Sequence, residues 1–148
     1  LKVDYENMIN WTTSTDYLRC NPNFYNHPRY DFLLVDSMER PFFAQLIMIF
    51  TCVIGRKSFP LALVHPVDQP ADSATEQLDK DLGFYRVRAQ TRRESTFVSV
   101  YMIIRGALLI EDFGVKATDG FKEYLVVDCI DGDSFLRMKS LKYAGRCN

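Results

Sequence analysis

Short β-prone segments separated by Gly, Pro and Asp turns constrain the fold of this chain most strongly, from residue 30 onward. Runs rich in β-branched and aromatic residues that are bounded by turn residues are typical of strands. The sequence lacks the long alternating helix and strand units that a doubly wound parallel sheet requires. We therefore predict an all-β domain, a partly closed antiparallel β-barrel with short helical turns.

Turn signals divide the β-prone region into separate strands. A hairpin turn is expected at 55–57, and further turns are expected at Gly114 and at 119–120. The strongest hairpin signal is Asp131-Gly132, because Asp-Gly favours the two-residue turns that join antiparallel strands. The predicted strands are 30–35, 42–54, 59–67, 82–89, 96–102, 107–112, 123–130 and 134–139.

The N-terminal segment 1–29 shows only weak periodicity and contains two proline turns. We predict that it forms an N-terminal arm with a short helix before Cys20. Trp11 and Tyr17 are expected to pack this arm against the body, residues 30–148. A chain of 148 residues is long enough for one domain with a real core, so we expect a single domain overall.

Charge and cysteine usage narrow the classes of function. With 18 basic and 19 acidic residues the net charge is −1, which argues against a basic nucleic-acid footprint over the whole domain but leaves a local patch open. The four cysteines form no C-x-x-C pair, so we predict no metal and no cofactor. Cys52 and Cys129 lie in apolar runs and are expected to be buried free thiols. The low cysteine density indicates an intracellular protein.

No complete catalytic motif is present. The sequence contains neither a G-x-S-x-G nucleophile elbow nor a glycine-rich phosphate loop, so we predict that this chain is not an enzyme. The apolar run 42–54 contains Gln45 and Thr51 and is too short to span a bilayer, and no membrane role is expected. An alternative is a metal-dependent nuclease or transferase fragment, in which aspartates from neighbouring strands converge. Its candidate residues are Asp31, Asp36, Asp128, Asp131 and Asp133.

Four arginines, Arg86, Arg88, Arg92 and Arg93, lie close together in the sequence. Arg86 and Arg88 would project to the same face of a strand, since side chains alternate with period two. Arginine favours bidentate contacts with phosphate or carboxylate. These side chains could therefore contact a partner such as DNA, or pair with the chain's own acidic loop at 68–81.

One set of motifs resembles the core pattern of bromo-adjacent homology (BAH) domains. That pattern has an aromatic-Tyr-Arg strand, a Phe-x-Ser strand and an Ile-x-Gly turn before another strand. The resemblance implies a β-barrel-like module that binds a protein or chromatin partner, with Phe84 and Tyr85 as partner-binding residues. The motifs that carry it are Phe43-Ala44-Gln45-Leu46, Gly83-Phe84-Tyr85-Arg86, Thr96-Phe97-Val98-Ser99 and Ile104-Arg105-Gly106-Ala107-Leu108.

A broader resemblance, over residues 24–140, is to the C-terminal region of transposase-like proteins from basidiomycete fungi, of the Plavaka or KDZ type. It implies a nuclear location and transposase catalytic acids that lie outside this chain. Because the chain begins at Leu1, we also expect it to be a piece of a longer protein. The motifs are Ala62-Leu63-Val64-His65-Pro66, Lys80-Asp81-Leu82-Gly83-Phe84-Tyr85-Arg86-Val87-Arg88, Ile103-Ile104-Arg105-Gly106-Ala107 and Asp133-Ser134-Phe135-Leu136-Arg137, with Asp131 just before the last.

Together these observations predict a non-catalytic accessory or interaction domain of a transposase-like nuclear protein, which binds a protein or chromatin partner in a BAH-like manner. The alternative is a DNA-contacting domain that uses an arginine face. That face would consist of Lys57, Arg86, Arg88, Arg92 and Arg93.

Overall fold

Antiparallel strands dominate the part of the chain that the computed structural model describes, residues 1–67, 83–113 and 122–144. The strands are β1 (Lys2–Glu6), β2 (Thr13–Tyr17), β3 (Cys20–Phe24), β4 (His27–Tyr30), β5 (Phe32–Val35), β6 (Phe42–Ile54), β7 (Lys57–Pro66), β8 (Tyr85–Arg88), β9 (Thr96–Ser99), β10 (Ile103–Ala107), β11 (Leu109–Glu111) and β12 (Glu123–Val126). Three short 3₁₀ helices, η1 (Arg92–Glu94), η2 (Val100–Met102) and η3 (Asp128–Ile130), and one α-helix, α1 (Gly132–Ala144), are the other described elements.

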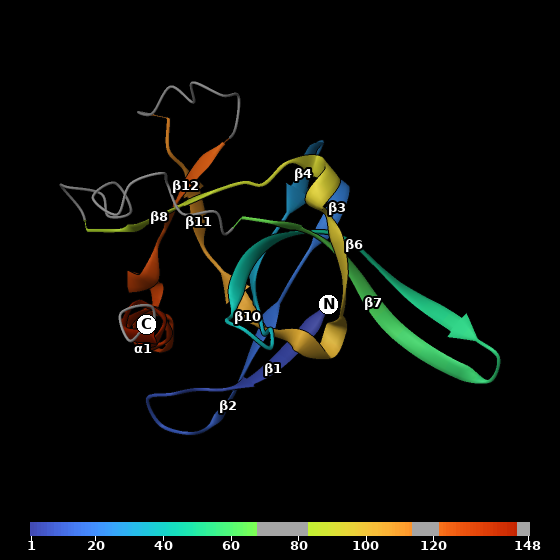
Figure 1. The fold of residues 1–148 in the computed structure, drawn as a ribbon, viewed down its shortest axis with the longest axis horizontal. Coiled ribbons are helices and arrows are strands. Elements are labelled where there is room, and N and C mark those ends of the chain that lie inside the picture. The colour runs from blue at the N-terminus through green and yellow to red at the C-terminus, as the bar shows by residue number, and fades with distance from the viewer. Residues whose placement is uncertain (68–82, 114–121, 145–148) are drawn as a thin grey trace.

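The strands form four sheets. A five-stranded sheet has the order β10-β5-β6-β7-β9, a three-stranded sheet has the order β11-β12-β8, and β1-β2 and β3-β4 are separate hairpins. The strand-dominated architecture confirms the all-β prediction. Among the described strands the predicted barrel is not found, because β10 and β9 end the five-stranded sheet without pairing with each other. Figure 1 shows that β6 and β7 run past their neighbours as a projecting hairpin instead of curling to close the sheet.

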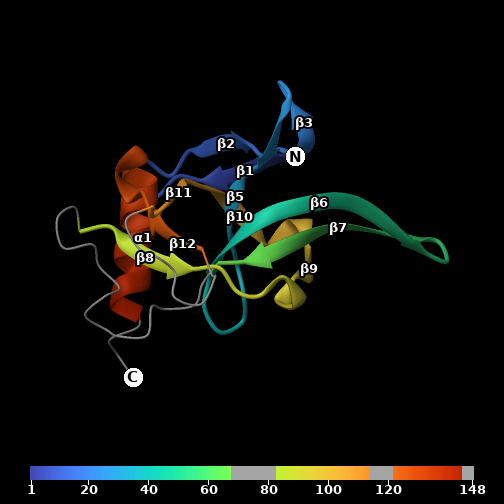
Figure 2. The ribbon, with the colours of Figure 1, turned by 90° about the horizontal axis from the view of Figure 1, so that it is seen from above.

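Two apolar clusters lie on the two faces of the five-stranded sheet. Successive strand residues point to opposite faces, so Ala44 joins the first cluster while Phe43 joins the second. The first cluster includes Val3 and Leu18 of the N-terminal hairpin. The second lies between the large sheet, the three-stranded sheet and α1, which Figure 2 shows together at one side of the molecule. The sheet is therefore a central layer, covered on both faces near the start of β6.

The N-terminal arm is built from hairpins, and the predicted short helix before Cys20 is wrong. Lys2 pairs with Tyr17 across β1 and β2, and Cys20 pairs with Tyr30 across β3 and β4. The expected packing anchors are also wrong, since Trp11 is 69% exposed and Tyr17 is 64% exposed. Tyr17 lies on the solvent side of its hairpin, and Trp11 lies in the loop between the strands. The smaller side chains that the hairpin contributes to the first cluster attach the arm to the body.

Residues 134–139 are helical, so the predicted last strand and its hairpin at Asp131-Gly132 are wrong. The carboxylate of Asp131 accepts a hydrogen bond from the Ser134 backbone N–H at 2.7 Å, which is a helix N-cap. The segment 132–144 contains no β-branched residue, which favours helix over strand. Met138 is buried and Leu141 packs beside it, so one stripe of α1 covers the second cluster. The Asp-Gly pair thus begins a helix.

Several expectations fall on parts of the chain outside the described residues. These are the acidic loop from residue 68 to 81, the turns at Gly114 and 119–120, and the start of the predicted strand at Leu82. Among the described residues, no helix is long and apolar enough to cross a membrane.

Candidate functional site

The distal part of β6 and β7 forms a two-stranded ribbon, defined here as residues 48–63. β5 pairs with β6 only over residues 42–45, and β9 pairs with β7 only over 61–64, so the far half of the ribbon has no neighbouring strand. Ile54 pairs with Lys57 across a two-residue turn. Gly55 begins that turn at φ +62°, a conformation that glycine adopts without strain and that type II′ hairpins require.

Cross-strand pairing shows which side chains share a face of the ribbon. Directly opposed residues in antiparallel strands point the same way, and the face repeats at every second residue. Phe50 opposes Leu61, Cys52 opposes Phe59, and Leu63 opposes both Met48 and Phe97 of β9. The Phe50 and Phe97 rings meet edge to face with centroids 5.5 Å apart. We call this surface the ribbon face, and it consists of Met48, Phe50, Cys52, Ile54, Phe59, Leu61, Leu63 and Phe97.

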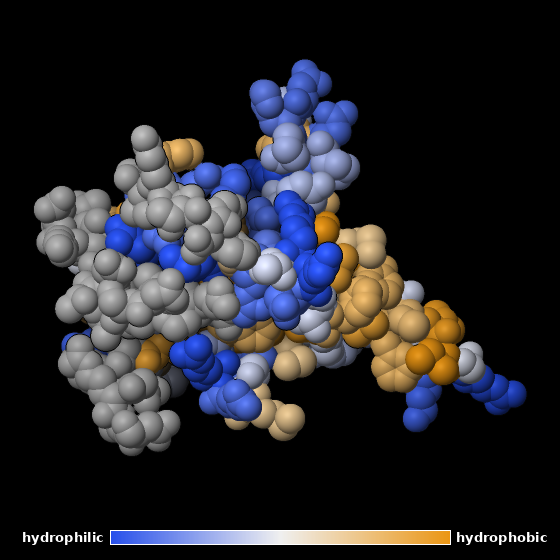
Figure 3. Space-filling view, turned by 45° about the horizontal axis from the view of Figure 1, so that its top comes forward, coloured by the Kyte–Doolittle hydropathy of each residue, from blue (hydrophilic) through white to orange (hydrophobic). Residues whose placement is uncertain are grey.

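The ribbon face is apolar and open to solvent. Ile54 is 67% exposed, Phe97 is 60% exposed and Phe59 is 41% exposed. In Figure 3, hydrophobic residues gather over the ribbon at the right, and hydrophilic residues mark its tip. Large apolar side chains that gather on one exposed surface, instead of scattering singly, are typical of interaction sites.

The same side of the sheet is covered nearer its base. His65, just beyond Leu63 on the same face of β7, is buried, and its Nε2 lies 2.8 Å from the carbonyl oxygen of Gln90. The backbone N–H of Gln90 in turn donates to the carbonyl of Pro66. A β-bulge between Leu46 and Met48 shifts the alternation by one residue, so Phe43 lies on the same side of β6 as Met48, and it is buried under the three-stranded sheet. The cover therefore ends between His65 and Leu63, and the apolar character of the surface continues past it.

The ribbon carries charge only at its tip. Arg56 and Lys57 are both exposed, and the region from Phe42 to Val67 contains no Asp or Glu. Among the described residues, neither side chain forms an ion pair. Lys57, a predicted nucleic-acid contact, thus lies at the far end of the ribbon, at the opposite end of the molecule from β8 in Figures 1 and 2.

Arg86 and Arg88 lie side by side on β8, as predicted, and both face carboxylates. Arg86 Nη2 lies 2.8 Å from Asp112, and its Nε lies 3.7 Å from Glu123. Arg88 Nη2 lies 2.8 Å from the other oxygen of Glu123, a residue that β12 places directly opposite Arg88. The two guanidinium groups are therefore neutralised by neighbouring strands.

Arg92 and Arg93 behave differently from the β8 arginines. Both are exposed in η1, and within the described ranges neither forms an ion pair. The structure therefore brings together Arg86 with Arg88 and Arg92 with Arg93, but Lys57 shares no surface with them. The predicted five-residue basic face is not formed as one surface, although nucleic-acid binding by these residues stays a prediction.

The two aromatic residues expected to bind a partner lie at the start of β8. Tyr85 is half-buried, pairs with Val126 of β12 and packs against the second apolar cluster. Phe84 is partly exposed just before the strand. Their role in partner binding stays a prediction.

A buried ionic cluster joins three distant parts of the chain. Arg105 of β10 is buried, and its guanidinium lies 2.7 Å from Asp133, 2.8 Å from Asp131 and 3.3 Å from Asp16. Arg137, one turn along α1, lies 2.7 Å from Asp133. The cluster therefore fastens the start of α1 and the N-terminal hairpin to the large sheet. It also joins the two segments around Arg105 and Asp133 that carry the transposase-like resemblance.

Neighbouring charges outweigh burial within this cluster. Burial opposes the charged form of Asp131, but hydrogen bonds from Arg105 and from the Ser134 backbone lower its pKa to about 2. Burial likewise opposes ionisation of Asp133, whereas Arg137, the Met8 backbone and Arg105 lower its pKa below the ordinary value. Burial also opposes the charge of Arg105, yet its hydrogen bonds to Asp131 and Asp133 raise its pKa. All three groups are thus charged at neutral pH.

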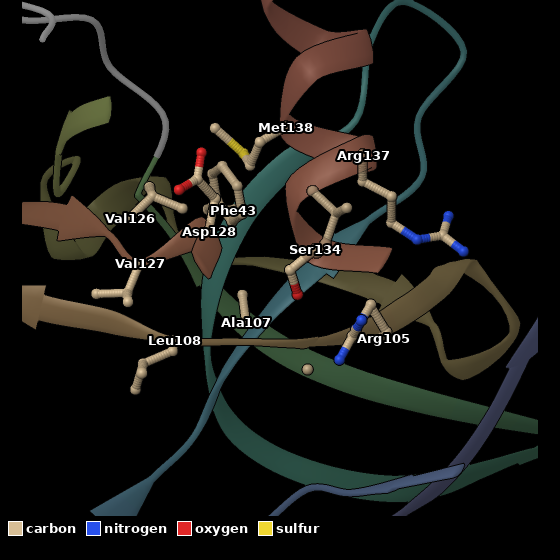
Figure 4. Close-up of a pocket in the computed structure, with 12 residues that line it drawn as sticks. Phe43, Arg105, Ala107, Leu108, Val126, Val127, Asp128, Ser134, Arg137 and Met138 are labelled. Carbon is tan, nitrogen blue, oxygen red and sulfur yellow. The ribbon is translucent and has the colours of Figure 1, made fainter. Parts of the chain in front are cut away.

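A small pocket lies beside this cluster, between α1 and β10. Figure 4 shows it beneath Met138 and Ser134 of the helix, with Ala107 on the other side. Its cavity volume is about 20 Å³, room for about one water molecule, whereas sites for organic ligands enclose roughly several hundred Å³. The pocket is therefore no substrate site of the usual size.

Three of the five aspartates of the metal-site alternative form ion pairs with arginines. Asp131 and Asp133 converge on Arg105, and Asp31 bonds to the side chain of Arg29 and to the backbone of Arg19. Across residues 1–67, 83–113 and 122–144, no group of three or more His, Cys, Asp or Glu side chains is placed to hold a metal ion.

The expectation of buried thiols is wrong for Cys129 and holds only in part for Cys52. Cys129 is exposed in η3, just past the end of β12, and Cys52 is partly exposed on the ribbon face. Each lies in an apolar run, but neither run is covered at that point. An apolar sequence run predicts a strand, and it does not say whether another layer covers the strand.

Comparisons with protein-family models, curated proteins and solved structures found no match. The BAH-like and transposase-like resemblances therefore stay predictions.

The ribbon face was not predicted from the sequence. One signal could have found it: the run from Met48 to Ile54 is apolar at nearly every position and leads directly into the basic hairpin turn at Gly55. A hairpin that carries charge only beside its turn has no charged face to present to solvent. Such a hairpin must be covered by another layer of the fold or by a partner.

Proposed function

We propose that this domain is a non-catalytic interaction module that binds a protein partner through the ribbon face. The class of function is the one implied by the BAH-like resemblance, and the setting in a transposase-like nuclear protein is carried over as part of the proposal. The observation that supports it is the uncovered apolar surface from Leu63 to Ile54, which continues a face that is buried elsewhere in the same sheet.

Physical considerations favour a partner for this surface. Burial of apolar surface contributes about 25 cal/mol for each Å². The ribbon leaves several large apolar side chains unburied. An isolated two-stranded hairpin is marginally stable in water and gains stability from packing on one face. A partner that covers Phe59, Ile54 and Phe97 would supply that packing.

Site-specific photo-cross-linking tests the proposal. A photoreactive phenylalanine analogue at Phe59 should give discrete cross-linked protein products in a nuclear extract of the source cells. The same analogue at Tyr25, which is exposed at the tip of the β3-β4 hairpin, is the control and should give none of these products. The Ile54→Ser substitution should remove the products formed from position 59. Cross-links that are absent at 59, or identical at 59 and 25, would contradict the proposal.

A second candidate function is DNA contact, and the exposed pair Arg92 and Arg93 favours it. This alternative concerns a different surface from the ribbon face. A salt titration of duplex binding, with variants of each surface, separates the two.

A further inference from the structure

The outer edge of β6 carries unpaired backbone groups along the ribbon. We define the β6 edge as residues 48–54, on the side away from β7. β5 stops pairing at Gln45, and the last backbone bond to this side is from the Leu46 N–H to the Asp31 carbonyl. Beyond that bond, no strand of the described chain pairs with the edge and no backbone hydrogen bond reaches it, although β3 and β4 contact β6. Unpaired groups of this kind are a template for an added strand.

Residues 48–54 lack the side chains that normally protect an edge strand. Proteins usually block such edges with lysine, proline or a bulge; residues 48–54 contain neither charge nor proline, and the β6 bulge between Leu46 and Met48 lies at their start. The opposite edge of the ribbon is less suited to pairing, because Pro60 has no N–H to donate and Lys57 lies beside it. Of the two edges, the β6 edge is the one whose residues are free of proline and charge.

The charge of the ribbon tip indicates the chemistry of the occupant. Arg56 and Lys57 are exposed and form no ion pair with another described residue. A strand that ends beside them would be favoured by an acidic residue at that end. In a two-fold pairing with a second copy, centred on Thr51, the tip would lie beside Gln45 and Leu46 of that copy. The adjoining carboxylate, Asp31, is already paired with Arg29. The charge distribution therefore favours a different protein as the occupant.

We propose that the β6 edge binds an extended segment of a partner protein by strand addition. The segment matches residues 48–54 in length, is apolar at alternate positions and carries Asp or Glu at the end beside Arg56 and Lys57. Strand addition supplies backbone hydrogen bonds, and alternate side chains supply specificity. The apolar side chains of the added strand would widen the ribbon face. This inference rests on the proposed function and specifies its partner.

Selection of peptides from a random display library, with the full 148-residue chain as bait, tests the inference. The enriched peptides should alternate apolar residues and contain an acid at one end. Binding of a synthetic enriched peptide should then slow hydrogen exchange of the amides in 48–54. The amides of β10, an edge strand elsewhere in the sheet, should exchange at an unchanged rate.

Substitution of the two basic residues at the ribbon tip, with an exposed arginine elsewhere as the control, tests the role of charge. The double variant Arg56→Gln, Lys57→Gln should weaken peptide binding by about fivefold, as for two exposed ion pairs. Arg40→Gln removes an exposed positive charge outside the ribbon and should leave the affinity unchanged. A circular dichroism spectrum of each variant should match that of the wild type.

The possible outcomes distinguish this inference from the proposed function. Peptides that bind without protecting the β6 amides, or without preference for an acid, would overturn strand addition while leaving the interaction module in place. Concentration-dependent dimers without peptide enrichment would identify a second copy as the occupant and overturn the proposed partner. If neither enriched peptides nor dimers were observed, the inference would also be overturned. Cross-linking from Phe59 would then decide the proposed function separately.

Discussion

The base of the five-stranded sheet and the ribbon carry the same kind of side chains on the same face, but only the base is covered. At the base, Phe43 and His65 lie beneath the three-stranded sheet and the segment that precedes η1. Along the ribbon, Phe59 and Ile54 continue that face into solvent. The contrast extends to charge, because buried Arg105 is surrounded by carboxylates, whereas the exposed arginine at the ribbon tip has none among the described residues. Apolar composition alone therefore does not separate core from interface.

The largest expected effect on stability comes from replacing the buried Arg105, in comparison with the exposed Arg56. Arg105→Ala leaves Asp131 and Asp133 without their main counter-charge. It should lower the free energy of unfolding by about 3–5 kcal/mol. Arg56→Ala removes an exposed side chain at the ribbon tip and should change it by less than about 0.5 kcal/mol. Urea denaturation of both variants measures the difference. Equal losses of unfolding free energy in the two variants would show that the ionic cluster does not stabilise the base of the sheet.

A second prediction concerns the helix that covers the base. Met138 is buried between α1 and the second cluster, whereas Phe135 lies on the exposed side of the same helix. Met138→Ala should therefore cost about 2–3 kcal/mol. Phe135→Ala should change the free energy of unfolding by about 0.5 kcal/mol at most. Thermal and urea unfolding provide the measurement. If Phe135→Ala were the more costly change, α1 would be packed by its other face.

The sequence predicted the elements whose signals are local. β6 was predicted with its observed ends, because a long β-prone run leads into Gly55 at the turn. α1 was missed because Asp131-Gly132 suits a hairpin turn as well as a helix start, and the hydrogen bond from Ser134 decides between them. The absence of β-branched residues after Gly132 was the available warning.

The candidate site was less predictable because it depends on which layers cover which face. Nothing near Arg86 in the sequence indicates that Asp112 and Glu123 neutralise it, since both acids come from much later segments of the chain. Likewise, the exposure of Phe59 depends on where the three-stranded sheet ends. Local patterns give the strands and the alternation of their side chains, whereas cover is a property of the tertiary fold.

Low pH should lower the free energy of unfolding through the carboxylates at the base of the five-stranded sheet. The ribbon contains no carboxylate. The folded state lowers the pKa of Asp131 from 3.8 to about 2, so this group contributes stability above pH 4 that is lost as the pH falls toward 2. The unfolded chain binds the proton more readily, which fixes the sign. Because water screens the part-exposed Asp131, we expect a loss of about 1 kcal/mol from it. Urea midpoints between pH 4 and pH 2 should fall less steeply in Asp131→Asn; identical slopes would exclude this carboxylate as the cause.

Substitutions on the ribbon face should separate binding from stability. Ile54 is mostly exposed, whereas Leu46 on the same strand is fully buried. Ile54→Ser should therefore change the free energy of unfolding by about 0.5 kcal/mol at most. Leu46→Ala should cost about 2–5 kcal/mol. Urea denaturation checks both, and cross-linking from Phe59 checks the binding. A large loss of stability in Ile54→Ser would make the ribbon part of the folded core and weaken its assignment as a partner surface.

The arginine pair that favours DNA contact lies outside both the base of the sheet and the ribbon. Its substitution should have the smallest effect on the comparison of those two regions. Arg92 and Arg93 are exposed in η1 and form no ion pair with another described residue. The double variant Arg92→Ala, Arg93→Ala should therefore change the free energy of unfolding by less than about 1 kcal/mol.

If the pair contacts phosphate, the duplex affinity of the wild type should fall with a log–log salt slope of about −0.9 for each contact. For two contacts, the affinity should fall about tenfold between about 50 and 200 mM salt. The double variant should then lose that binding, whereas the Ile54→Ser variant should keep it. Absence of wild-type duplex binding at about 50 mM salt would remove the DNA alternative, and retained binding in the double variant would move any phosphate contact away from η1.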